Sequence, residues 1–270
     1  MKIAVIAILF LSFCSRAIAT IDYVAHGMPA TDRDWNGAEI ETFARVIRSK
    51  VVPLPRLSEK EGAEQFRRLV SEANFGLARD TAIPLDGRIP DFLRFIQAQR
   101  DIMMQYVTEA NQGADLHREV TELMCYMLKS STVMIKLSDE LVPTIKKDST
   151  FEIRMDGLKK MKNAMAVAFT GAEESLSERN FYDAADLSRL LKTMTDCLPI
   201  FAATFSNEFR QELGLKLKKR MEEFPSADDK ASIHSMLLLL ERQPNQALQH
   251  NDPSCHVSCL RTPRASRGRG

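Results

Sequence analysis

The chain has 270 residues, of which 44% are hydrophobic and 27% charged, and this composition excludes a disordered chain, a collagen and a small disulfide scaffold. The formal net charge is only +1, aromatic residues make up 7%, and there are 11 glycines and 11 prolines. Helix-forming residues fill the long stretches between these glycines and prolines, which also excludes an all-β sandwich with a turn at intervals of about ten residues. The composition therefore favours an all-α protein.

Residues 1–19 have the pattern of a secretory signal peptide. Lys2 supplies the positive charge, residues 3–13 form an uncharged apolar run, and Ala17-Ile18-Ala19 is a small-x-small cleavage site before Thr20. The run is shorter than the roughly 20 residues of a membrane span, so retention as an anchor is disfavoured. Acylation of Cys14 is disfavoured by the bulky phenylalanine before it. We expect export to a periplasm or the extracellular space, with no transmembrane segment in the mature chain.

After the leader, apolar residues recur with the 3.6-residue period of amphipathic helices almost everywhere. In chain order they predict about eight helices, with apolar faces within 40–47, 58–80, 92–110, 116–141, 149–176, 181–198, 199–221 and 226–240. Capping boxes at 58–61 and 149–152 mark two helix starts, and Pro199 suits the first turn of the seventh helix. Residues 83–90 contain proline and glycine signals that predict a turn-rich link.

The helix predicted at 116–141 carries the strongest periodic signal. Its seam residues alternate spacings of four and three, with a serine as the only polar member: Leu116, Val120, Leu123, Met127, Ser130, Met134, Leu137 and Leu141. Further apolar residues widen this stripe, so we expect the helix to be central in a bundle. Short links and the absence of a repeat predict a single domain over 20–242, an irregular all-α multi-helix bundle. A flexible, basic, low-complexity tail is expected at 243–270.

The distribution of charge argues against a nucleic-acid partner. The leader contributes +2 and the tail +3, which leaves the body of the chain at −4. The charges are interspersed along the predicted helices and do not form the basic cluster that would follow a phosphate backbone. We therefore expect the protein to bind no nucleic acid.

One short stretch resembles a ligand motif. Asp32, Asp34 and Asn36 followed by Gly37 match the first half of a calcium loop, in which alternate oxygen-bearing side chains face the ion. The glutamate expected six residues after the glycine is replaced by Phe43. The favoured interpretation is that Asp34 or Asn36 caps the first helix, and calcium is the only cofactor that the sequence suggests.

Four cysteines remain after the leader: Cys125, Cys197, Cys255 and Cys259. In an oxidising compartment this even set allows two disulfides in three connectivities. A bridge between Cys125 and Cys197 would join the fourth and sixth helices, and the alternative is that both are buried thiols. The tail also holds His250 and His256, but adjacent Cys255 and His256 are poorly placed to bind one tetrahedral zinc ion, so a disulfide is preferred there.

No catalytic motif is present. His117 and His234 have no carboxylate three or four residues away, and we interpret them as solvated or core side chains. Glu173, Glu174 and Glu178 are interpreted as a solvated helical face. The sequence thus favours a protein without enzymatic activity that binds a partner protein, as an inhibitor, an immunity protein or an effector does, with 83–90 as a contact loop. The alternative is an α-helical enzyme or metal-dependent hydrolase whose site residues are dispersed.

Overall fold

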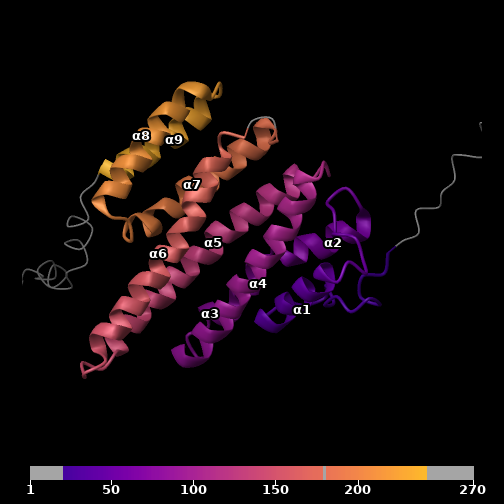
Figure 1. The fold of residues 1–270 in the computed structure, drawn as a ribbon, viewed down its shortest axis with the longest axis horizontal. Coiled ribbons are helices and arrows are strands. Elements are labelled where there is room, and N and C mark those ends of the chain that lie inside the picture. The colour runs from indigo at the N-terminus through magenta and orange to yellow at the C-terminus, as the bar shows by residue number, and fades with distance from the viewer. Residues whose placement is uncertain (1–20, 179–180, 242–270) are drawn as a thin grey trace, which may run out of the picture.

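The computed structural model describes residues 21–178 and 181–241, and every regular element in these ranges is a helix (Figure 1). They form α1 (Gly37–Arg48), α2 (Lys60–Leu69), η1 (Glu72–Phe75), α3 (Gly76–Arg79), α4 (Leu85–Asn111), α5 (His117–Leu141), η2 (Val142–Thr144), α6 (Phe151–Ser175), α7 (Ala184–Ala202), α8 (Asn207–Glu223) and α9 (Ala227–Glu241). The all-α multi-helix prediction is confirmed. The leader 1–19 and the tail 243–270 lie outside the described residues.

The long helices run side by side in one tilted array, with α1 and α2 at one end and the α8–α9 hairpin at the other (Figure 1). The extensive contacts follow this order: α1 packs on α4, α4 on α5, α5 on α7, α7 on α9, and α9 on α8, while α6 packs mainly on α5. Since α5 contacts α4 on one side and α6 and α7 on the other, it lies at the middle of the array, as its seam predicted.

The burial of α5 shows why this helix is central. Six of the eight seam residues are at most 2% exposed, and Met127 and Leu141 are half-buried. Residues on other faces are buried too, among them Cys125, Tyr126 and Ile135. A helix that is buried on several faces belongs to the core of a protein.

The segment before α1 is held by a buried tryptophan. Trp35 is 1% exposed, its indole N–H donates to the carbonyl of Ala30 at 2.7 Å, and its backbone N–H donates to Oδ1 of Asn74 at 2.8 Å. The ring packs against Phe43 of α1. The tryptophan thus joins three segments and its indole donor is satisfied, which is how tryptophan is accommodated in a core.

Several predicted boundaries were wrong, each because side-chain hydrogen bonds override the signal in the local sequence. The predicted link 83–90 falls largely in α4, whose first turns are held by buried Arg88 through hydrogen bonds to the Ala78 carbonyl and to Glu140. The predicted helix 58–80 is interrupted after α2, since Asn74 donates to the carbonyls of Arg68 and Leu69.

Three helix starts also differ from the prediction. The boxes at 58–61 and 149–152 make no side-chain cap, because α2 begins after Glu59 and α6 after Thr150. Pro199 lies inside α7, and α8 begins only at Asn207, capped by Ser206.

A membrane span requires a helix that is both long and apolar. None of the helices in the described ranges combines the length and the apolar composition that crossing a bilayer requires.

Candidate functional site

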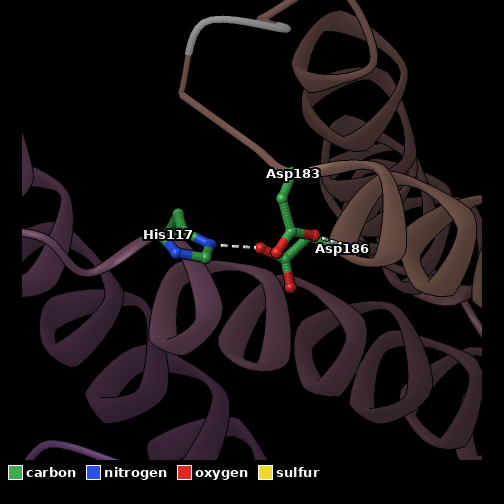
Figure 2. Close-up of side chains that lie close together, drawn as sticks. All are labelled: His117, Asp183 and Asp186. Carbon is green, nitrogen blue, oxygen red and sulfur yellow. Dashed lines mark hydrogen bonds and ion pairs between the residues drawn. The ribbon is translucent and has the colours of Figure 1, made fainter. Parts of the chain in front are cut away.

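The most concentrated group of chemically active side chains lies where α5 and α7 begin. Because α6 returns the chain along α5, α7 runs in the same direction as α5, and the two first turns are neighbours. His117 is the first residue of α5, Asp183 is the N-cap of α7, and Asp186 lies in the first turn of α7. Figure 2 shows the imidazole pointing from α5 at the two carboxylates of α7.

The two ring nitrogens of His117 face different carboxylates. Nδ1 is hydrogen-bonded to Oδ2 of Asp186, and Nε2 lies 3.4 Å from Oδ1 of Asp115. Oδ1 of Asp183 accepts the backbone N–H of Asp186 at 2.8 Å, which caps α7. One donor atom from each of His117, Asp183 and Asp186 lies within 4.8 Å of the others. This group of three residues is called the α5–α7 cluster below.

The cluster lies at the edge of the core. The side chain of Asp186 is 11% exposed, that of His117 is 25% exposed, and that of Asp115 is 86% exposed. The hydrogen bond to Asp186 raises the pKa of His117, burial opposes this effect, and the charges of Asp186, Asp115 and Asp183 add to the increase. The site therefore favours a positive charge at the imidazole.

Sequence reasoning missed this cluster. Spacing along the sequence indicates contacts of His117 within its own helix, whereas Asp186 is 69 residues further along the chain. The apolar period predicted a helix within 181–198, which contains both aspartates, but it gave no sign that the start of this helix lies beside His117. Only the return of the chain through α6 brings that start to His117.

The proposed calcium motif has other contacts. Asn36 caps α1: its Oδ1 accepts the N–H groups of Ala38 and Glu39 at 2.9 and 3.2 Å, and Glu39 accepts the N–H of Asn36. This is a complete capping box, so the helix-cap interpretation is confirmed. Asp34 pairs with Arg68 at 2.6 Å, and Asp32 is exposed. Calcium binding here stays an untested prediction.

The cysteines of the described ranges carry no disulfide. Cys125 of α5 and Cys197 of α7 are both buried free thiols, although their helices pack together. Burial raises the pKa of both, that of Cys197 to about 12, so the reactive thiolate is suppressed. The proposed bridge between them is therefore not formed in this structure. Cys255, Cys259, His250 and His256 lie outside the described residues.

The interpretation of the glutamates as a solvated face was wrong for Glu173. This side chain is 2% exposed on α6, where it faces Arg220 at 3.4 Å and Lys216 at 4.0 Å, both from α8. Glu174 and Glu178 are exposed as expected. The prediction failed because α8 covers the side of α6 on which Glu173 lies.

Two shallow hollows lie over α2, with volumes of about 270 and 290 Å³. They share Thr31 and Glu64, whose side chains are hydrogen-bonded at 3.0 Å. Neither hollow includes a residue of the α5–α7 cluster.

Within the described residues, the α5–α7 cluster is the group of side chains that could hold a metal ion. The cluster has the chemistry either of a protonated histidine held by carboxylates or of a cation site. Comparison with known proteins adds nothing to these possibilities, since no family model, no curated protein and no solved structure matches the chain.

Proposed function

We propose that this protein is exported and acts by binding a partner protein through the outer face of α6. The signal-peptide pattern of residues 1–19 supports export. The observation that carries the binding proposal is an exposed seam on α6, apolar except for Lys160, that the rest of the described chain leaves uncovered.

α6 buries fewer residues than α4 and α5, the two helices of similar length. Of its 25 residues only Leu158, Phe169, Ala172 and Glu173 are buried. Exposed residues recur on the opposite side at spacings of four and three, namely Ile153, Gly157, Lys160, Ala164 and Val167. Ile153 is 73% exposed and Val167 is 67% exposed. Apolar residues in a helical seam normally face another surface, so this side of α6 is suited to a partner.

Gly157 lies within this seam. A Cβ added there would have no heavy atom within 4 Å, so nothing in the described chain requires a glycine. A glycine inside a helix costs about 0.5–1 kcal/mol relative to alanine. A partner whose backbone approaches α6 closely at this point would account for it.

The charges beside the seam indicate the chemistry of the partner. Lys159, Lys160 and Lys162 lie around the middle of α6. Lys160 pairs with Asp156 of the same helix and Lys162 with Asp139 of α5. Lys162 faces α5, so Lys160 is the paired lysine of the outer face, and a complementary surface would have an apolar ridge with a carboxylate that replaces Asp156 as its partner.

Site-specific photo-crosslinking in the cells that produce the protein tests the proposal. A photoreactive residue at Val167 should give an adduct with one partner protein, whereas the same residue at Lys192, an exposed position on α7, should not. With the purified partner, Val167→Asp should weaken binding about tenfold or more without lowering the melting temperature. Identical adducts from both positions, an adduct of two copies of this chain, or unchanged binding of Val167→Asp would overturn it.

A metal-dependent hydrolase is the second candidate, and the α5–α7 cluster is the observation that favours it. The cluster, however, lies at the edge of the core, and neither of the two hollows over α2 includes any of its residues. An enzyme site is normally a cavity that surrounds its substrate. Partner binding is therefore the preferred function.

A further inference from the structure

We propose that His117, Asp183 and Asp186 bind a divalent transition-metal ion such as Zn²⁺, which links the first turns of α5 and α7. The inference goes beyond partner binding and concerns a different part of the molecule from the outer face of α6. It also supplies the ion that the second candidate function requires.

The donor set suits such an ion. Imidazole nitrogen and carboxylate oxygen are both zinc ligands, with bonds of about 2.0–2.2 Å, so two donors of one tetrahedral ion lie about 3.3–3.6 Å apart. The three donors here lie within 4.8 Å of one another, so side-chain rotations that move them by about 1 Å bring them to this spacing. Three protein ligands leave a fourth position for water, as in zinc sites that are open to substrate.

Asp115 provides an independent observation. A histidine that binds a metal nearly always donates its other ring N–H to a carboxylate or carbonyl, which fixes the tautomer and orients the ring. Here Nδ1 faces the two carboxylates of α7, and Nε2 lies 3.4 Å from Oδ1 of Asp115. The imidazole is therefore already oriented with Nδ1 toward the proposed ion and Nε2 toward its supporting carboxylate.

The charge balance also favours a cation. Two helix N-termini meet at the site, and each contributes an effective charge of roughly +0.5. Three carboxylates, those of Asp115, Asp183 and Asp186, outweigh them. Nδ1 of His117 faces Oδ2 of Asp186, and the proposed ion would lie between them. Because a metal binds the neutral imidazole, binding to Nδ1 releases one proton to solvent from each molecule whose ring is protonated.

Isothermal titration of the purified chain with Zn²⁺ tests the proposal. To remove the competing ligands of the tail, His250 and His256 are replaced by alanine, and Cys255 and Cys259 by serine. We expect one ion per chain, with release of about one proton at pH 6 in buffers of different ionisation enthalpy. Co²⁺ in place of Zn²⁺ should give d–d bands without thiolate charge transfer.

Substitutions in this background identify the ligands. His117→Ala should weaken binding about 100-fold or more, because it removes the only nitrogen donor. Asp183→Ser should weaken it about tenfold while the serine still caps α7, so that loss of binding is separated from loss of folding. His234→Ala, at an exposed histidine of α9, is the matched control and should change nothing. No binding in the tail-substituted protein, or affinity unaffected by His117→Ala and Asp183→Ser, would overturn the proposal and leave the group as an ion pair.

Discussion

At the residue scale, His117 and Glu173 show how this fold treats charged side chains. From sequence, His117 was interpreted as a solvated or core side chain and Glu173 as part of a solvated face, and both contact opposite charges from another helix. The His117 pair is partly open to solvent, whereas Glu173 is 2% exposed. Loss of a partner should therefore have a modest effect at the first site and a large one at the second, because an unpaired buried charge is costly.

The raised pKa of His117 makes a prediction about stability against pH. A histidine whose pKa is higher in the folded than in the unfolded state stabilises the fold below its unfolded pKa of about 6.5. This contribution is lost as the pH rises through the folded-state pKa. With a chelator present, His117→Gln should cost up to about 1 kcal/mol at pH 5.5 and clearly less at pH 8.5, measured by urea unfolding. A difference that grows with pH would contradict the assignment.

The buried carboxylate of Glu173 gives a second prediction. Arg220→Met leaves it with Lys216 alone at 4.0 Å, so the free energy of unfolding should fall by about 2–3 kcal/mol. Glu174→Gln, the exposed neighbour on the same helix, should change it by less than about 0.5 kcal/mol. Equal effects in chemical denaturation would show that Glu173 is solvated in the native protein.

At the scale of elements, the sequence predicted the features that depend on periodicity and failed where tertiary contacts decide. The seam of α5 and its central place result from the 3.6-residue period, because burying an apolar stripe requires neighbours on that side. The start of α4 does not result from this period, because Arg88 stabilises it through hydrogen bonds to the Ala78 carbonyl and to Glu140. The α5–α7 cluster could not be predicted from sequence either, because the distance between His117 and Asp186 depends on the path of α6.

The seam of α5 gives a third prediction. Leu123 is fully buried, so Leu123→Ala should lower the free energy of unfolding by about 2–5 kcal/mol through lost apolar contacts and a cavity. Lys136 lies on the same helix but is exposed, and Lys136→Ala should cost less than about 0.5 kcal/mol. Urea titration of the two variants makes the comparison, and similar losses would remove α5 from the centre of the fold.

At the scale of the whole molecule, the extensive contacts have one order, from α1 through α4, α5, α7 and α9 to α8. The helices at the two ends of this array therefore depend on fewer neighbours than α5 does (Figure 1). Local unfolding is easiest where few buried contacts are lost. The α8–α9 hairpin, attached mainly through α7 and the Glu173–Arg220 pair, should be the first large part to open.

Native-state hydrogen exchange tests this prediction. Amides of α5 should exchange only through global unfolding. Those of α8 and α9 should exchange through a local opening whose free energy is about 1–3 kcal/mol lower and depends less on urea concentration. Arg220→Met should lower the free energy of opening of α8 and α9 further and leave that of α1 unchanged. The same exchange free energy and urea dependence in α5, α8 and α9 would mean that the array unfolds as one unit.

The ordered contacts of the array also bear on how the chain is made. Synthesis proceeds from the N-terminus, and most of the long helices pack against one that has already been completed: α4 on α1, α5 on α4, α6 and α7 on α5, and α9 on α7, whereas α8 packs mainly on α9, which follows it. Folding can therefore advance with translation, since α1–α4 can assemble as soon as α4 is complete. α5 can then pack on α4 through its seam. Of the long helices, α8 must wait for a later one, because it packs mainly on α9.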